Sequence, residues 1–464
     1  MKRLSLKTLV ILLLAALLMA SCAPAATASP AEEATEPPAA STTDTAAPAE
    51  EASPTASSPA EPLELEFWTL LTGNLAQTLD DMVQQYNAAH PEVKIVNVNQ
   101  GGYAEIQQKM LAAVAAGNPP VISMMDYKNV PYYAQAGVLE PLNDYETAED
   151  VEDFIPGLFA DLTVDGKLYG LPFNRSTQGV YYNKELFQTA GLDPEKPPET
   201  WDELLEYSQA IRKLGDDYYG IYATGNMQWF FEAYVYQAGG EFSDADCNFT
   251  FNDEYGQQAA QYLQDLVYKY NVALIPSVLT GTFDQKQIEF VNGKVGMTRD
   301  STALNSYIGS SVDFDWGFAM LPAGPAGRFV TSGGANLVIG AKASPEEKQA
   351  AWDFIRWLTN TENSAAFSMA TGYLPTRYSV TELPEMKEFY ETHPTWKTSV
   401  DELQYVHPTS CGVLNVPNWE TTMNGAMDRI LVNHEDVKTV LDETVAELNA
   451  TIADARNDGT LIKK

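Results

Sequence analysis

A regular alternation of two hydrophobic periods opens the folded part of this chain. Alternating apolar residues predict a strand over 63–67, helical spacing follows over 75–86, and the pattern repeats as strand 93–98, helix 106–114 and strand 121–125. Strands separated by helices in this way form mainly parallel sheets with helices on their faces. We therefore expect an α/β fold whose ligand lies at the carboxyl ends of these strands, in the loops that follow them.

The length of the chain predicts more than one hydrophobic core. The segment from Leu63 to Lys464 exceeds the roughly 250–300 residues at which single cores stop growing, so we expect two domains. The chain has 63 acidic and 28 basic residues, a formal net charge of -35. A protein this acidic repels a phosphate backbone, so we expect no nucleic-acid partner.

The N-terminus has the layout of a secretory signal peptide. Three basic residues, Lys2, Arg3 and Lys7, precede an apolar run over 9–20 that is too short to span a bilayer. The end of this run, Leu18-Met19-Ala20-Ser21-Cys22, resembles a bacterial lipobox. We therefore expect residues 1–22 to be a lipoprotein signal with Cys22 as the lipidated residue, which places the protein outside the cytoplasm on a bacterial membrane. Ordinary secretion without a lipid remains open.

Residues 23–62 have the composition of a disordered tether. They are almost entirely Ala, Pro, Ser, Thr and Glu, with too little apolar surface to offset the entropy of ordering the chain. Such a segment would let a folded domain move above the membrane while remaining attached to it.

Motifs of known enzymes are absent from the sequence. It has no Gly-x-Ser-x-Gly elbow, no His-Glu-x-x-His, no phosphate-binding Gly-Lys-Ser/Thr loop and no dinucleotide fingerprint, and its four His read as loop or surface residues. We expect no catalytic residue and no cofactor. A pair of carboxylates acting as a glycosidase remains open, because the chain has many acids.

A cluster of oxygen-bearing side chains resembles a calcium loop only in part. Asp244, Asp246, Asn248 and Asp253 lie close in sequence, but Phe249 and Tyr255 stand where such a loop needs Gly and Glu. We interpret the cluster as a polar turn and expect no metal site.

Two cysteines beyond Cys22 can form a disulfide. An extracytoplasmic location permits a bond between Cys247 and Cys411, but spacing alone does not show that they approach each other.

Aromatic residues are plentiful and several fall in expected loops. An aromatic ring packs well against the C–H face of a sugar, so these residues are candidate ligand contacts, although each can equally be core packing. The candidates are Trp68, Tyr103, Trp229, Tyr373 and Trp419.

Several longer motifs carry a family resemblance. The segments are 172–177 (PFNRST), 181–184 (YYNK), 190–194 (AGLDP), 197–201 (PPETW), 292–294 (NGK), 332–334 (SGG), 351–358 and 371–375 (TGYLP). Together they make the chain similar to the extracellular solute-binding proteins of sugar ABC importers, nearest the glycerol-3-phosphate-binding branch. The resemblance covers nearly all of 63–464.

This resemblance implies a two-lobe, type II periplasmic-binding-protein-like fold with a ligand cleft between the lobes. It assigns 63–172 and 297–335 to the N-terminal lobe, and 173–296 and 336–464 to the C-terminal lobe. It also implies hinge crossings near Leu171–Asn174, Val295–Arg299 and Ala335–Gly340.

The resemblance further implies a set of ligand contacts. Carried over by position, they are Tyr103, Asp126, Ser176, Ser301, Gly334 and Tyr373. Asp126 stands where the branch has Glu. Where the branch has an arginine suited to phosphate, this chain has Glu420, although Arg175 and Arg299 can supply positive charge. A carboxylate repels a phosphate but accepts hydrogen bonds from hydroxyls. We therefore expect a neutral sugar, glycoside or polyol, with glycerol-3-phosphate or a glycerophosphodiester as the alternative.

The expected function is capture of the solute by lobe closure. The partners that the resemblance implies are the transmembrane permease subunits of an ABC importer and the ATPase that drives it, and the protein is expected to be a monomer. Two other hypotheses remain: a tethered carbohydrate-active enzyme, and an adhesion module that binds polymer without closing.

Overall fold

The computed structural model describes residues 61–146, 151–159, 161–223, 227–275, 288–416 and 419–459. The chain separates into two units, Met1–Pro59 and Ala60–Lys464, and every described residue belongs to the second unit. The predicted signal peptide, Cys22 and nearly all of the predicted tether lie outside the described ranges. Within those ranges, no helix combines the length and the apolar character needed to cross a bilayer.

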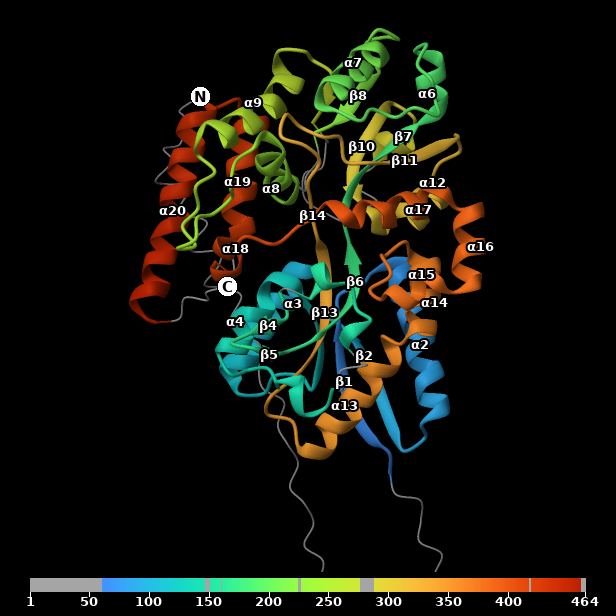
Figure 1. Ribbon diagram of the computed structural model, residues 1–464, viewed down its shortest axis with the longest axis vertical. Coiled ribbons are helices and arrows are strands. Elements are labelled where there is room, and N and C mark those ends of the chain that lie inside the picture. The colour runs from blue at the N-terminus through green and yellow to red at the C-terminus, as the bar shows by residue number, and fades with distance from the viewer. Residues whose placement is uncertain are drawn as a thin grey trace, which may run out of the picture. The chain divides into compact units, whose positions relative to one another are not determined.

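The first of two five-stranded sheets contains the predicted alternation. β1 (Leu63–Thr69) pairs in parallel with β2 (Val93–Asn99) and β3 (Ile122–Asp126), and α2 (Gly73–Ala89) and α3 (Tyr103–Ala116) connect them. This part of the prediction is confirmed. Two later strands complete the sheet in the order β2-β1-β3-β13-β6, namely β13 (Gly333–Ile339) and β6 (Leu171–Ser176), both antiparallel to their neighbours (Figure 1).

The second sheet has the order β11-β7-β10-β8-β9. Its strands are β11 (Trp316–Met320), β7 (Gln178–Asn183), β10 (Val295–Ser301), β8 (Tyr219–Tyr222) and β9 (Ala273–Leu274). Its helices include α6 (Lys184–Thr189), α7 (Trp201–Arg212), α8 (Met227–Ala238), α9 (Glu254–Tyr268), α11 (Ile288–Val291), α12 (Asn305–Ser311), α19 (Trp419–Leu431) and α20 (Val437–Asn457). Each sheet with its helices forms one lobe of a two-lobe α/β fold.

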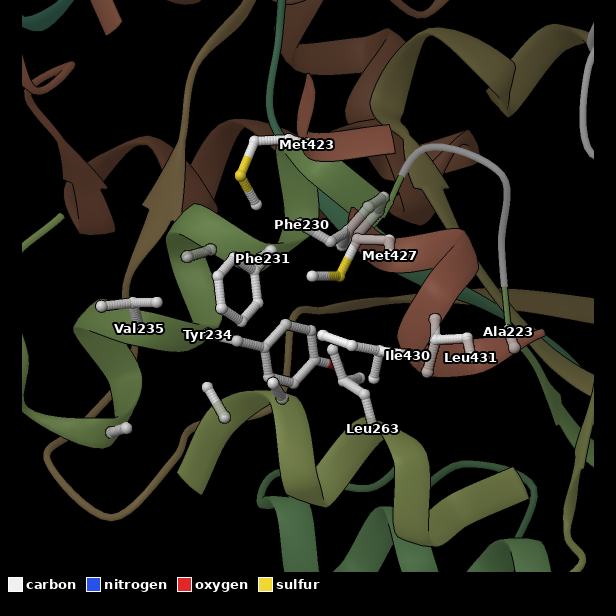
Figure 2. Packing of buried hydrophobic residues seen from close by; sticks show 14 of the residues in the cluster. Ala223, Phe230, Phe231, Tyr234, Val235, Leu263, Met423, Met427, Ile430 and Leu431 are labelled. Carbon is white, nitrogen blue, oxygen red and sulfur yellow. The ribbon is translucent and has the colours of Figure 1, made fainter. Parts of the chain in front are cut away.

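The core of the second lobe holds α19 firmly. Figure 2 shows Phe230, Phe231 and Tyr234 of α8 packed against Met423, Met427 and Ile430 of α19, with Leu263 of α9 beside them. All of these side chains are buried. The apolar stripe of α19 therefore fixes the direction in which the first turn of this helix presents its polar residues.

The sheets correct the expected division of the chain. Most of β10 and all of β11 fall in the range 297–335 that was expected in the N-terminal lobe, but both strands lie in the second sheet. Conversely, the range 336–464 was expected in the C-terminal lobe, but the second half of β13 lies in the first sheet, and α13 (Pro345–Leu358) and α14 (Thr361–Thr371) contribute to the first core. The expectation failed because these segments are buried on both faces, and burial alone does not say which sheet a strand joins.

The chain crosses between the lobes at three places. β6 runs directly into β7 at Thr177, and β12 (Val330–Thr331) runs into β13 at Ser332. The third connection leaves α14 and returns through a run of short helices to β14 (Val406–His407), which pairs with β12. These helices are α15 (Tyr378–Glu382), α16 (Pro384–Thr392) and α17 (Pro394–Asp401).

One of the expected crossings is wrong, because Val295–Arg299 lies wholly in β10 of the second sheet. The other two are displaced by a few residues. The crossing expected near Leu171–Asn174 falls at Thr177, and the one expected near Ala335–Gly340 falls at Ser332.

The remaining elements of the described structure are short. They are α4 (Val130–Gln135), β4 (Thr163–Val164), β5 (Lys167–Leu168) and α18 (Cys411–Asn415), with 3-10 turns η1 (Tyr127–Asn129), η2 (Leu142–Asp144), η3 (Pro156–Leu158), η4 (Thr302–Leu304) and η5 (Glu402–Tyr405).

Local sequence signals account for several boundaries. Ser344 and Glu347 form a complete capping box at the start of α13. The Thr200 hydroxyl accepts the Glu203 N–H at the start of α7, but the Glu203 carboxylate accepts from the backbone of Glu199. The Asp244 carboxylate accepts the N–H groups of Asp246 and Asn248, as in a polar turn.

Cys247 and Cys411 form the disulfide that the sequence left open. Their Cα atoms are 5.1 Å apart, and the bond joins the loop after α8 to the first residue of α18. Gly412 N also donates to the Ser243 hydroxyl. The segment that leads into α19 is therefore tied to the second lobe.

A buried carboxyl group braces the first crossing. Glu402 is fully buried; one of its oxygens accepts the Thr177 hydroxyl at 2.9 Å and the other accepts Leu321 N at 2.7 Å. Burial raises the pKa of Glu402 to about 8, although the hydrogen bonds from Leu321 and Thr177 and the charge of Arg328 oppose the rise.

We predict that Glu402 makes the stability of the protein depend on pH. Its folded pKa lies above the ordinary value of 4.5, so its contribution is fully present below pH 4.5 and is lost as pH rises through 8. The loss is about 5 kcal/mol at one 1.36 kcal/mol step per pKa unit. Urea unfolding at pH 5, 6.5 and 8.5 should show Glu402→Gln losing less stability over this range than wild type. Glu388→Gln, exposed on α16, is the control, and equal slopes for all three proteins would contradict the prediction.

Candidate ligand-binding site

Two strands of the first sheet, β3 and β6, place polar side chains in one row on either side of β13. β13 pairs Ala335 with Asp126 at the end of β3 and with Asn174 in β6. The Asn174 side-chain carbonyl accepts Ala335 N at 3.1 Å, which orients its amide. The row lies at the carboxyl end of the parallel strand β3, where ligands bind in α/β sheets.

Two tyrosines lie beside this row. Tyr103 begins α3, and its hydroxyl accepts the Asn174 amide at 3.4 Å. Tyr373 follows α14, and its ring stacks on Phe367 with the ring centroids 5.7 Å apart. Burial raises the pKa of Tyr103 well above its ordinary value, and the nearby Tyr373 and Asp126 raise it further. Tyr103 therefore keeps its proton and can both donate and accept a hydrogen bond.

The second crossing brings Ser176 and Trp229 together at two glycines. Gly333 pairs with Ser176, and a Cβ on Gly333 would lie 2.8 Å from the Trp229 ring and 3.3 Å from the Ser176 hydroxyl. Trp229 is half-buried, and its indole N–H donates to Ser332 O at 3.4 Å. At Gly334 the backbone is left-handed, with φ +104°, and a Cβ would lie 1.9 Å from Asn174 O.

Ser301 lies at the end of β10, close to the turn that carries Tyr373. Its hydroxyl accepts Ala303 N at 3.2 Å and so caps η4. A Cβ on Gly372 would lie 2.9 Å from Thr302 O, so the two turns pack closely. Ser301 is thus near the site, but its hydroxyl is occupied as an acceptor of a backbone N–H.

A lysine links the first lobe to the second at this site. The Lys128 ammonium lies 2.8 Å from an Asp126 carboxylate oxygen and 2.6 Å from Glu420 in the first turn of α19. The Lys128 side chain is only 6% exposed and that of Glu420 is 34% exposed. Burial alone would lower the pKa of Lys128, but the Asp126 and Glu420 carboxylates together raise it, so Lys128 is protonated.

One of the aromatic candidates lies elsewhere. Trp419 is 1% exposed in the core of the second lobe, with its ring centroid 5.9 Å from that of Phe242, so it is a packing residue and not a ligand contact. Trp68 pairs with Ser123, three residues before Asp126 in β3, and its indole N–H donates to the Glu66 carboxylate at 3.2 Å. Its contact with a ligand stays a prediction.

The two arginines that were expected to offer positive charge are buried and hydrogen-bonded within the fold. The Arg175 guanidinium donates to Asn336 and Ser332 and lies 3.9 Å from Asp161. Arg299 donates to the Tyr234 hydroxyl and to Tyr222 O. Both arginines stabilise the strands around the crossings, and the charge of Arg175 also acts on Asp126 and Tyr103.

The sequence of the chain matches a known protein family. A model of the bacterial extracellular solute-binding proteins matches residues 81–397. The chain belongs to this family. The family resemblance that the sequence motifs indicated is confirmed.

Two curated relatives share most of their length with this member of the family. The sn-glycerol-3-phosphate-binding periplasmic protein UgpB of Pectobacterium atrosepticum is 28% identical over 415 residues, which cover 84% of this chain and 91% of the relative. The protein of the same name from Rhizobium meliloti is also 28% identical and covers 84% of this chain and 94% of its own.

Solved structures with the same fold bind different solutes. UgpB from Mycobacterium tuberculosis in complex with glycerophosphocholine is 26% identical, with a TM-score of 0.77 over 85% of this chain and 99% of its own. The cyclic alpha-maltosyl-1,6-maltose binding protein from Arthrobacter globiformis is 28% identical, with a TM-score of 0.72 over 85% of this chain and 100% of its own.

Sequence reasoning missed Lys128 and Asn174. Lys128 comes two residues after Asp126, in a loop that was expected to carry ligand contacts, so its position was the available signal. Asn174 lies within one of the family motifs, but nothing in the sequence pairs it with Tyr103.

We predict that Gly334→Ala lowers the free energy of unfolding by about 2–4 kcal/mol, because it adds a strained left-handed residue and a clash with Asn174 O. Gly425→Ala is the matched control: this glycine is exposed in α19 with no atom within 4 Å of an added Cβ. That change should stabilise the protein by about 0.5–1 kcal/mol. Thermal denaturation of wild type and the two variants measures whether each change lowers or raises stability. A Gly334→Ala protein as stable as wild type would contradict the predicted backbone strain.

Proposed function

We propose that this protein is the solute-binding component of an ABC importer and that it captures an uncharged sugar, glycoside or polyol. The observation that supports it best is the convergence of both lobes on one polar cluster. The first lobe supplies Asp126, Lys128 and the two tyrosines, and the second lobe supplies Glu420. Carboxylates, phenols and an amide are the groups that bind sugar hydroxyls, while aromatic rings pack on the sugar face.

Lobe closure is the proposed mechanism. The ligand would bind on the first lobe, and the second lobe would add contacts only when the lobes close, so the ligand favours the closed state by its differential affinity. We propose these contacts: Trp68, Tyr103, Asp126, Ser176, Trp229, Ser301, Gly334, Tyr373 and Glu420. No bond of the solute is broken.

A second candidate ligand is glycerol-3-phosphate or a glycerophosphodiester. The names of the two curated relatives favour it. The charges at the site favour the uncharged ligand, because Asp126 and Glu420 face a single lysine and both nearby arginines are engaged elsewhere.

The proposed location is the outer face of a bacterial membrane. Lipidation of the Cys22 thiol and cleavage of the signal before it would anchor the protein, residues 23–62 would act as the tether, and the closed monomer would deliver its solute to the permease subunits. This part of the proposal rests on the sequence of the N-terminus.

We predict that an uncharged saccharide or polyol stabilises the purified protein and is recovered intact. At a hundredfold over its Kd, a ligand that binds only the folded state adds about 2.7 kcal/mol, which shifts Tm by a few degrees. The measurement is a thermal-shift screen with product analysis, followed by small-angle scattering of each hit. Compaction with an unchanged ligand is the expected result. Consumption of the hit would favour the enzyme hypothesis, and binding without compaction would favour the adhesion module.

We predict that Cys22 carries the lipid. Cells that express the wild-type protein should incorporate labelled palmitate into it and retain it in the membrane fraction. Cys22→Ser should abolish the label and release the protein, whereas Cys247→Ser should keep the label. A labelled Cys22→Ser protein would refute the anchor.

A further inference from the structure

Lys128 is held in place from within its own loop. Asp126 ends β3, and its carboxylate accepts Lys128 N at 3.4 Å, so the chain turns at once through η1. The side chain then folds back and its ammonium reaches the same carboxylate at 2.8 Å. The ring of Tyr127 lies 5.4 Å from the ammonium and flanks it. The ammonium therefore has one position, set by β3 and not by a flexible loop.

The same ammonium is the point where the second lobe reaches the Asp126 row. Glu420 accepts from Lys128 at 2.6 Å. Packing of Met423 and Met427 in the second core holds the first turn of α19, and the Cys247–Cys411 disulfide holds the segment before it. Closure of the lobes and pairing of Lys128 with Glu420 are therefore one event. Removing one partner of a buried ion pair such as this one destabilises the protein strongly, because the other charge stays buried and unpaired.

Donors and acceptors at Lys128 fit a hydroxyl better than a phosphate. An ammonium has three N–H donors, and Asp126 and Glu420 take one each, so a third remains for a ligand. Within the described part of the chain, the second oxygen of Asp126 accepts only the long bond from Lys128 N. A hydroxyl can accept from Lys128 and donate to Asp126 at the same time, whereas an ionised phosphate oxygen can only accept.

The local charge also discriminates against phosphate. Asp126 and Glu420 carry two negative charges against the one positive charge of Lys128, which leaves the group at -1. Arg175 lies 3.9 Å from Asp161, whose carboxylate balances most of its charge, and Arg299 is buried beside Tyr234 and Tyr222 of the second lobe. A phosphate dianion that entered between the lobes would meet a net negative site where water is scarce.

We propose that Lys128 is the residue that selects the ligand, donating to a hydroxyl of an uncharged saccharide while it joins Asp126 to Glu420 across the lobes. This proposal rests on the proposed function, because it assumes that the solute binds where the two lobes meet. In this proposal, the third N–H of Lys128 binds a hydroxyl of the ligand. Phosphate esters bind weakly because Asp126 and Glu420 together carry one more charge than Lys128 neutralises.

The test compares Lys128→Met, Lys128→Arg and Glu420→Gln with wild type. Lys348→Met is the matched control, because Lys348 forms a partly buried pair with Glu140 at 2.9 Å within the first lobe. Titration calorimetry uses maltose, maltotriose and cellobiose as uncharged probes, and glycerol-3-phosphate and glycerophosphocholine as phosphate probes. Circular dichroism confirms that each variant is folded.

Wild type should bind at least one uncharged probe and bind glycerol-3-phosphate at least tenfold more weakly. Lys128→Met should weaken saccharide binding tenfold or more, Lys128→Arg should restore part of it, and Lys348→Met should leave it unchanged. Glu420→Gln removes one negative charge, so that Asp126, Lys128 and residue 420 are together neutral. We expect the affinity of this variant for glycerol-3-phosphate to come closer to its affinity for the saccharide.

Unchanged saccharide binding in Lys128→Met overturns the role of Lys128 and leaves the proposed function intact. Tighter binding of a phosphate probe than of any saccharide by wild type overturns both the proposed ligand class and the role of Lys128. Failure of every probe to bind wild type overturns the proposed ligand class and this inference with it.

Discussion

The insertion of β13 between β3 and β6 is the interaction on which the site depends. Its antiparallel ladders put Asp126, Ala335 and Asn174 in one row, although the three residues are far apart in sequence. Strands in a sheet lie about 4.8 Å apart, so the carboxylate and the amide are spaced by backbone hydrogen bonds. β13 follows directly from β12 at the crossing between the lobes. The row of Asp126, Ala335 and Asn174 therefore lies next to the point where the proposed closure would move one lobe against the other.

Periodicity predicted the first part of the fold and failed at the strands of the crossings. The pattern over 63–125 predicted three strands and two helices because β1 and the two helices each have one buried face, while β3 is a short, fully buried apolar run. β6 and β10 are buried along their whole length, so their sequences carry no period that tells one sheet from the other. Sheet membership of β10 and β13 is a long-range property, and the resemblance did not supply it.

The candidate site was predictable to the extent that it lies at the ends of strands. The position of Asp126 after a buried strand was a sound reason to expect a ligand there, and Lys128 in the same loop follows from that reasoning. Aromatic identity was a poor guide, because a ring is equally suited to a core: Trp419 lies in the second core, while Tyr103 lies beside the Asp126 row. Arg175 is held inside the fold by Ser332 and Asn336, which are distant in sequence, so no local pattern could predict these hydrogen bonds.

Closure and selectivity are linked in this protein because they use the same charged group. The pair between Lys128 and Glu420 stabilises the closed lobes even without a ligand. The binding free energy of a ligand therefore includes only those contacts with Lys128 that the ligand-free closed state lacks. A hydroxyl adds a hydrogen bond without displacing either carboxylate. An anion that accepts the third N–H must lie beside the Asp126 and Glu420 carboxylates, which repel it where water is scarce. The site thus rejects anions through the contact that closes it.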